Sequence, residues 1–134
     1  MTLILSEMQI KLLRAEVEKS FPLEACALLF GEHKEDVVTV DKVIVASNIL
    51  ESTTRFEVDP TFVAFAFEQA EKEGLDFIGL FHSHPAPATP SAIDVRYMKL
   101  WGSAVWLILS TLDGEIAAFR KLDDQTERVE IEIK

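Results

Sequence analysis

The segment FHSHPAPATPSAID, residues 81–94, decides the fold, because a strand must end and a helix must begin within it. The apolar run at residues 76–82 indicates a buried strand that carries the first of two histidines, His82 and His84. Three prolines then exclude regular structure up to residue 90. Ser91 is typical of a helix N-cap, so we expect a helix from there to about Trp101.

The remaining patterns place helices and strands on both sides of this segment. A capping box at residues 6–9 predicts a helix over 7–19, and Asp59-Pro60 predicts a second helix that ends before residue 74. Apolar or β-branched runs predict strands at 25–30, 37–46, 104–110, 115–121 and 128–133, with a polar turn at 31–36. The sequence therefore predicts the α/β class, as one domain over residues 1–134 with a mixed, curved β-sheet packed against helices.

The composition limits the classes of partner that the protein can bind and indicates the compartment in which it works. The formal net charge of -10 comes from 23 acidic and 13 basic residues, and no basic block offsets it, which argues against nucleic acid or an anionic membrane as partner. No apolar stretch is long enough to span a membrane, and the N-terminus lacks the pattern of a signal peptide. A single cysteine, Cys26, fits a reducing compartment. We expect a cytoplasmic protein, either a monomer or a homodimer.

The quoted segment has the residue types of a zinc site. In an extended strand His82 and His84 point to the same side, and Asp94, in the first turn of the predicted helix, can join them as a third ligand. A catalytic zinc takes three protein ligands and leaves a fourth position for water. The same letters also fit an ordinary proline-rich turn, because serine followed three residues later by aspartate starts many helices without function. The pattern alone leaves both interpretations open.

A hydrolytic site also needs a general base. Glu24 immediately precedes the buried run at 25–30, where burial would raise the pKa of its carboxyl toward a catalytically useful value. From the residues alone, however, an ordinary solvated glutamate between a helix and a strand is by far the commoner case at such a position.

Three stretches, PLEACALLFG, NILESTTRFEVDP and GLFHSHPAPATPSAID, resemble the JAMM form of the MPN domain in the expected order. The resemblance covers nearly the whole chain and is that of a stand-alone prokaryotic, archaeal-type member. It implies a cytidine-deaminase-like architecture and a zinc metalloprotease that removes ubiquitin-like modifiers or sulfur-carrier proteins. Cleavage would follow the C-terminal glycine of the modifier, in a conjugate or in a linear precursor.

The resemblance also implies a role for each motif residue. His82, His84 and Asp94 become ligands of one Zn²⁺, and Glu24 becomes the base that activates the zinc-bound water and later protonates the leaving amine. Ser91 becomes a donor to the oxyanion of the tetrahedral intermediate. The loop between His84 and Ser91 is one residue shorter than is usual in the family, which we interpret as a tighter loop with all ligands kept.

Two other functions compete with this one. A non-catalytic MPN scaffold that binds partner proteins would typically have lost some of the ligands, whereas all five motif residues are present here. A zinc deaminase would need a pair of cysteines, and this chain has one. We expect Cys26 to be a buried apolar residue and not a nucleophile. The phenylalanines at 62, 65 and 67 should mainly pack their helix, and any exposed one would suit a partner surface.

Overall fold

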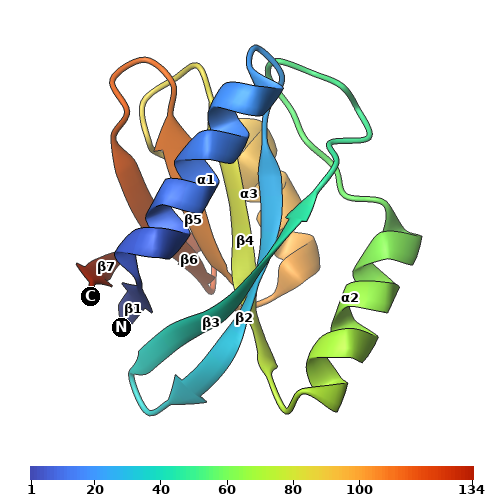
Figure 1. The fold of residues 1–134 in the computed structure, drawn as a ribbon. Coiled ribbons are helices and arrows are strands. Elements are labelled where there is room, and N and C mark those ends of the chain that lie inside the picture. The colour runs from blue at the N-terminus through green and yellow to red at the C-terminus, as the bar shows by residue number, and fades with distance from the viewer.

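Seven strands and three α-helices make up the structure, a computed structural model that describes residues 1–134 (Figure 1). In chain order the elements are β1 (Thr2–Leu5), α1 (Glu7–Ser20), β2 (Cys26–Lys34), β3 (Val37–Ala46), α2 (Pro60–Lys72), β4 (Asp76–His84), α3 (Ala92–Met98), the 3₁₀ helix η1 (Lys99–Trp101), β5 (Val105–Ser110), β6 (Ile116–Leu122) and β7 (Gln125–Ile133). No helix is both long and apolar enough to cross a membrane.

The strands close into a barrel in the order β1-β3-β2-β4-β5-β6-β7. Strand β4 pairs with β2 in antiparallel and with β5 in parallel orientation, so it lies in the middle of the sheet. Short β1 closes the barrel by pairing in parallel with β3 on one side and β7 on the other. The site-bearing strand is therefore held on both edges by backbone hydrogen bonds.

Helix α1 packs against one face of the strands. It begins with the predicted capping box, in which Ser6 and Gln9 exchange side-chain and backbone hydrogen bonds. Its buried residues Ile10, Leu13 and Val17 join strand residues in a cluster of 17 buried side chains. Fully burying one such aliphatic side chain contributes about 1.5–3 kcal/mol, so this face anchors the helix to the sheet.

Helices α2 and α3 cover the opposite face (Figure 1). Along β2, Ala27 and Leu29 point to the α1 side, whereas Cys26, Leu28 and Phe30 point to the α2 and α3 side. The central strands are thus buried on both faces, which explains why the sequence there is continuously apolar instead of alternating. The same alternation along β4 sends His82 to the α3 side, where it stacks on Phe56.

The structure confirms a mixed α/β fold and corrects several details. The sheet closes into a barrel, and the predicted likeness to cytidine deaminases stays a prediction. Strand β1 was missed, because four residues before a helix, three of them apolar, give no strand pattern of their own. The turn predicted at 31–36 is wrong, since β2 continues to Lys34 and only Glu35 and Asp36 turn.

The predicted packing of α2 is wrong for Phe65, which is exposed, while the small residues Ala66 and Ala70 form the buried face of the helix. Phe67 is partly exposed but packs its ring against Phe30 and Phe77, as predicted. Phe62 is half-buried against the same cluster. Small residues bring α2 close to the sheet and leave the larger rings at its border.

Candidate metal and hydrolytic site

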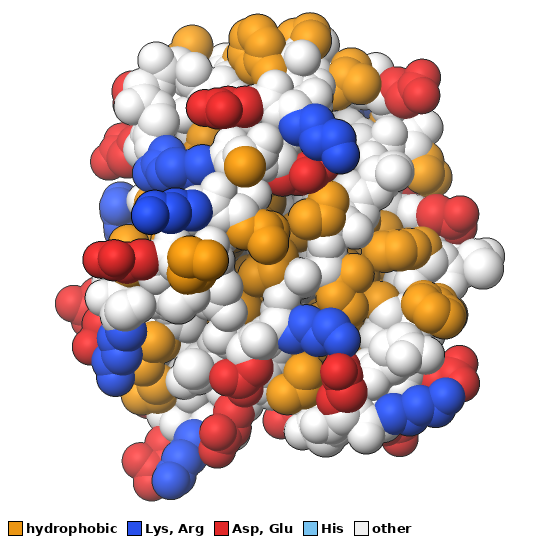
Figure 2. Space-filling view, in the orientation of Figure 1, with side chains coloured by type: hydrophobic (Ala, Val, Ile, Leu, Met, Phe, Trp, Pro, Cys, Tyr) orange, Lys and Arg blue, Asp and Glu red, His pale blue; other side chains and the backbone are white.

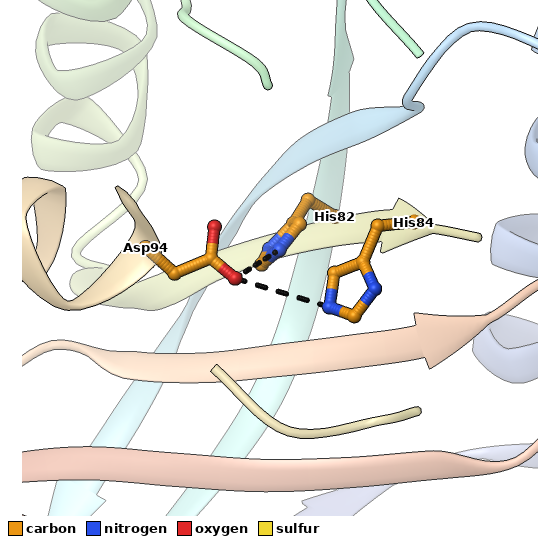
Figure 3. Close-up of side chains that lie close together, drawn as sticks. All are labelled: His82, His84 and Asp94. Atoms are coloured by element: carbon orange, nitrogen blue, oxygen red, sulfur yellow. Dashed lines mark hydrogen bonds and ion pairs between the residues drawn. The ribbon is translucent and has the colours of Figure 1, made fainter. Parts of the chain in front are cut away.

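Strand β4 brings the two histidines together at its C-terminal end. His82 and His84 project from the same face, as their spacing predicts, and Figure 3 shows both rings turned toward Asp94. Both histidines are buried, with His82 fully enclosed. Their ring centroids lie 5.2 Å apart. Strand geometry therefore fixes two ring nitrogens side by side.

The first turn of α3 supplies the carboxylate. Ser91 is the N-cap and Asp94 is the third helical residue, in a reciprocal capping box: Ser91 N donates to Asp94 Oδ2 at 2.9 Å and Asp94 N donates to Ser91 Oγ at 3.0 Å. Asp94 Oδ2 lies 3.2 Å from Nε2 of His82 and 3.8 Å from Nε2 of His84. The predicted trio thus meets at one point, and the helix start holds its carboxylate.

The short loop at 85–90 is anchored to the barrel. Ala88 is buried against Ile108, Ala117 and Phe119 on β5 and β6. At the start of the loop, His84 O accepts a hydrogen bond from Thr111 N at 3.0 Å. A loop fixed by prolines and by a buried side chain loses less entropy when it is ordered, which suits a rigid site. Although the loop between His84 and Ser91 is one residue shorter than usual, it still lets Asp94 reach the histidines.

Aromatic side chains hold His82 in position, and the sequence patterns gave no sign of this. Phe56 stacks on the His82 ring with centroids 4.6 Å apart and planes 19° from parallel. Trp106 packs edge-on against the same ring from β5, at 5.7 Å. Phe56 comes from the loop after β3, so its place beside His82 depends on tertiary structure. Only its position as a lone aromatic residue in a polar segment could have drawn attention to it.

Glu24 lies where β2 begins, next to the same end of β4. Cys26 is opposite His82 in the antiparallel register, which places Glu24 level with His84. Ala25 N donates to Ser83 Oγ at 2.9 Å, and Ser83 N donates to Ala25 O at 3.1 Å. These two bonds tie the residue after Glu24 to the residue between the histidines. The sequence analysis missed this role of Ser83.

The environment shifts the protonation of Glu24. Its side chain is 3% exposed, and its Oε1 is buried without a hydrogen-bond partner. Burial, with a smaller contribution from the Asp94 carboxylate, raises the pKa of Glu24 from 4.5 to about 8. A carboxyl with such a pKa can both accept and release a proton near neutral pH, as a general base requires.

The pKa values of His84 and Asp94 are both lowered, and both shifts favour the binding of a cation. Burial, reinforced by the neighbouring His82, lowers the pKa of His84, which keeps its imidazole neutral. Burial acts to raise the pKa of Asp94, but the hydrogen bond and the charge of His82 outweigh it, so the net pKa is lowered. A neutral imidazole and an ionised carboxylate are the forms that bind metals.

The residues present fit a bound cation. Ligand atoms of His82, His84 and Asp94 all lie within 4.8 Å of one another, and all three residues are buried. His84 Nε2 has no hydrogen-bond partner although it is buried. Leaving such a group unpaired costs about 1–3 kcal/mol, which a metal bond would relieve. Two imidazoles and a carboxylate are a donor set that zinc accepts, with a position left for water.

Ser91 and Cys26 complete the residues singled out from the sequence. Ser91 is exposed at the rim of the site, and its Oγ accepts the capping bond from Asp94 N, so its hydroxyl hydrogen is still available to donate.

Cys26 is buried and donates to Ala46 O at 3.4 Å. Burial, with the Glu24 and Glu16 carboxylates, raises the pKa of its thiol to about 12. The prediction that Cys26 is a buried apolar residue is confirmed.

Comparison with known proteins gives one family and several relatives. The family of prokaryotic homologs of the JAB domain, Prok-JAB, matches residues 6–123. A desampylase of Pyrococcus furiosus is 40% identical over 105 residues, covering 78% of this chain and 71% of that protein. A desampylase of Haloferax volcanii is 32% identical over 115 residues, covering 84% and 80%.

Two further similarities extend these matches. A probable TtuB-protein conjugate cleaving protease of Thermus thermophilus is 33% identical over 85 residues, which are 62% of this chain and 54% of that protein. The solution structure of a Desulfitobacterium hafniense protein superposes with a TM-score of 0.89 at 30% identity, over 100% of this chain and 93% of that one.

Proposed function

Because this chain belongs to the Prok-JAB family, the prokaryotic homologs of the JAB domain, we propose that it cleaves ubiquitin-like modifiers from conjugates with the help of one zinc ion. The family match confirms the JAMM resemblance seen in the sequence. Relatives named desampylase and conjugate cleaving protease agree with the predicted isopeptidase activity, so the chain is a hydrolase of this type.

The buried trio supports a zinc centre made by His82, His84 and Asp94. Zinc held there would act as a Lewis acid, lowering the pKa of a water molecule and polarising the scissile carbonyl. Phe56 and Trp106 hold the His82 ring, and the capping bond from Ser91 N holds the Asp94 carboxylate. The ligands are thus positioned by rigid elements before any substrate arrives.

Glu24 is our candidate for the proton carrier. Its raised pKa allows it to take a proton from the attacking water and to deliver the same proton to the departing amine nitrogen. The amide bond then breaks: the amine leaves neutral, and the modifier leaves as a carboxylic acid that releases its proton to solvent. The hydrogen bonds between Ala25 and Ser83 fix the strand that carries Glu24 relative to the histidines.

Ser91 is our candidate for the donor to the developing oxyanion. Its Oγ already accepts the bond from Asp94 N, so the hydroxyl hydrogen is directed away from the helix. A donor fixed where negative charge develops stabilises the transition state more than the ground state. This role also explains why the capping residue sits at the rim of the site instead of in the core.

The substrate class follows from the relatives. We propose a ubiquitin-like modifier or sulfur-carrier protein, cut after its C-terminal glycine, as the names of the relatives suggest for those proteins. A cytoplasmic place of action agrees with the single reduced cysteine. The competing scaffold function is not favoured, because the five motif residues are present and four of them are buried together.

The observation that carries this proposal is the buried cluster of His82, His84 and Asp94, with an unpaired ring nitrogen, beside unpaired Glu24. The test measures bound metal and then cleavage of a modifier joined by an isopeptide bond to a lysine, before and after chelation. We expect one zinc per chain, loss of cleavage with the chelator, and recovery on adding zinc. If the zinc-loaded protein leaves both branched and linear substrates intact, the proposal is wrong.

A further inference from the structure

A groove runs between α1 and the end of β3 and reaches Glu24. We call it the acidic groove; its volume is about 590 Å³, and its lining includes Glu16, Lys19, Glu24, Ala46 and Glu51. In Figure 1 the C-terminal ends of α1 and β3 lie at the same end of the molecule. The groove therefore leads from solvent to the residue proposed to carry the proton.

Acidic side chains outnumber basic ones in the acidic groove. The carboxylates of Glu16 and Glu51 line it against the single ammonium group of Lys19, and the buried carboxyl of Glu24 lies beside them. Glu24 differs from the other two, because it is 3% exposed and its Oε1 has no hydrogen-bond partner. Glu16 is half-buried and Glu51 is exposed. The unpaired oxygen at the inner end of the acidic groove can accept a hydrogen bond from a group that enters it.

A second groove reaches the site at Asp94, and its lining differs from that of the acidic groove. Its volume is about 330 Å³, and it is bordered by Arg55 and Arg96 together with apolar side chains such as Leu50 and Ile93. In Figure 2 hydrophobic side chains gather in the centre of the visible face and at its upper end. The charges of this second groove are balanced, since Glu57 and Asp94 line it together with the two arginines, whereas acidic side chains outnumber basic ones in the acidic groove.

The proposed proton transfer from Glu24 determines which end of the substrate lies in each groove. The departing amine must lie within reach of Glu24, since Glu24 supplies its proton. The carbonyl side, which belongs to the modifier, then extends toward Asp94 and the groove with the two arginines. The acidic groove is left for the protein that bears the modified lysine.

An unpaired strand edge lies beside the same groove. β3 pairs with β1 only from Val37 to Thr39, and Val40 O accepts a bond from Gln9 Nε2 at 2.8 Å. From there to Ala46 this edge of β3 pairs with no strand. An extended segment can bind such an edge through its main chain, independent of sequence, while the groove acids select its side chains.

We propose that the acidic groove binds the acceptor segment of the conjugate, and that Glu16 and Glu51 select modified lysines that lie in basic stretches. This inference rests on the proposed function for the direction of the substrate. Basic residues that flank the modified lysine pair with Glu16 and Glu51, whereas acidic neighbours are repelled. Glu16 and Glu51 are specificity residues and do not take part in the proton transfer.

The test uses two isopeptide conjugates that share one modifier and differ only in the acceptor peptide, with arginines or with glutamates flanking the lysine. The zinc-loaded wild type should show a kcat/KM about tenfold higher for the basic conjugate, a ratio that falls as salt rises. The variant E16Q/E51Q should lose the preference with kcat nearly unchanged, and E16K/E51K should reverse it. The control E68Q/E71Q, on exposed positions of α2, should keep it.

Binding gives a readout that does not depend on cleavage. The unconjugated basic peptide, labelled with a fluorophore, should bind the zinc-loaded wild type more tightly than E16Q/E51Q and as tightly as it binds E68Q/E71Q. Equal kcat/KM for both conjugates, or a preference that survives in E16Q/E51Q, overturns the inference while leaving the isopeptidase intact. If neither conjugate is cut, the proposed function fails, and the peptide affinities alone decide whether the groove binds basic segments.

Discussion

Ala25 and Ser83 exchange two hydrogen bonds, of 2.9 Å to Ser83 Oγ and 3.1 Å from Ser83 N. They lie 58 residues apart in the chain. One follows the candidate base Glu24 and the other separates the two candidate histidine ligands. This contact joins the two halves of the site, so it helps to fix the distance between the base and the metal ligands.

Ser83→Ala should therefore slow the reaction without removing the metal. Loss of the buried acceptor leaves Ala25 N unpaired and frees the start of β2, and we expect kcat to fall about tenfold while zinc content stays at one per chain. Steady-state kinetics with metal analysis checks this. Ser110→Ala is the matched control, because Ser110 is also buried but its Oγ accepts from Leu112 N in the turn after β5. A tenfold loss in both variants would contradict the assignment.

Phe56→Leu should weaken zinc binding, because the leucine side chain cannot stack on the His82 ring. Supporting residues around a metal site typically contribute about 10-fold to 100-fold in affinity, and we expect the lower end of that range. Competition with a fluorescent zinc chelator measures the change. Phe30→Leu, in the same buried cluster but away from the histidines, should lose stability without losing zinc affinity. An unchanged affinity in Phe56→Leu would show that stacking does not orient His82.

Glu24→Gln should change the pH dependence of stability in the metal-free protein. Burial and Asp94 raise the pKa of Glu24 from 4.5 to about 8, so between these pH values the folded state holds a proton that the unfolded state releases. The free energy of unfolding of the wild type then falls as pH rises through this window. Glutamine does not titrate, so the variant should be the more stable protein at about pH 9, with no difference at about pH 4.

Chemical denaturation in the presence of a chelator measures this difference. The control is Glu57→Gln, at a position where the side chain is only partly buried. It should follow the wild-type curve. A Glu24→Gln advantage that is the same at both ends of the pH range would mean that the carboxyl is not protonated in the folded state.

Gly79→Ala should destabilise the sheet that supports the histidines. A Cβ at Gly79 would overlap Val105 O, where β4 pairs with β5. Because backbone atoms cannot yield, we expect a loss of at least about 3 kcal/mol in the free energy of unfolding. Gly74→Ala is the comparison: its φ of +73° disfavours alanine, but no atom lies within 4 Å of the added carbon, so the loss should be about 1 kcal/mol. Equal losses in urea titrations would contradict the steric account.

Sequence patterns predicted most of the helix starts and strands that depend only on neighbouring residues. The capping boxes at Ser6 and Ser91, the Pro60 helix start and the continuous apolar strands all carry their cause within a few residues, and the structure confirms each. The geometry that joins His82, His84 and Asp94 was predictable for the same reason, since strand alternation and a helix N-cap place the three side chains.

Features that depend on long-range pairing were not predictable in this way. Strand β1 exists because β3 and β7 lie on either side of it, and β7 is more than 100 residues away in the chain. Phe56 and Ser83 act through partners distant in sequence, so neither stands out in its own segment. The exposure of Phe65 likewise follows from the close approach of Ala66 and Ala70 to the sheet.

The central claim is that Glu24 carries the proton at a zinc centre built by His82, His84 and Asp94. The most direct measurement compares zinc-loaded wild type and Glu24→Gln for single-turnover cleavage of an isopeptide conjugate, with zinc content determined in the same samples. We predict equal zinc, one per chain, and a rate about 10²-fold to 10⁴-fold lower in the variant. Cleavage by Glu24→Gln at the wild-type rate would contradict the account.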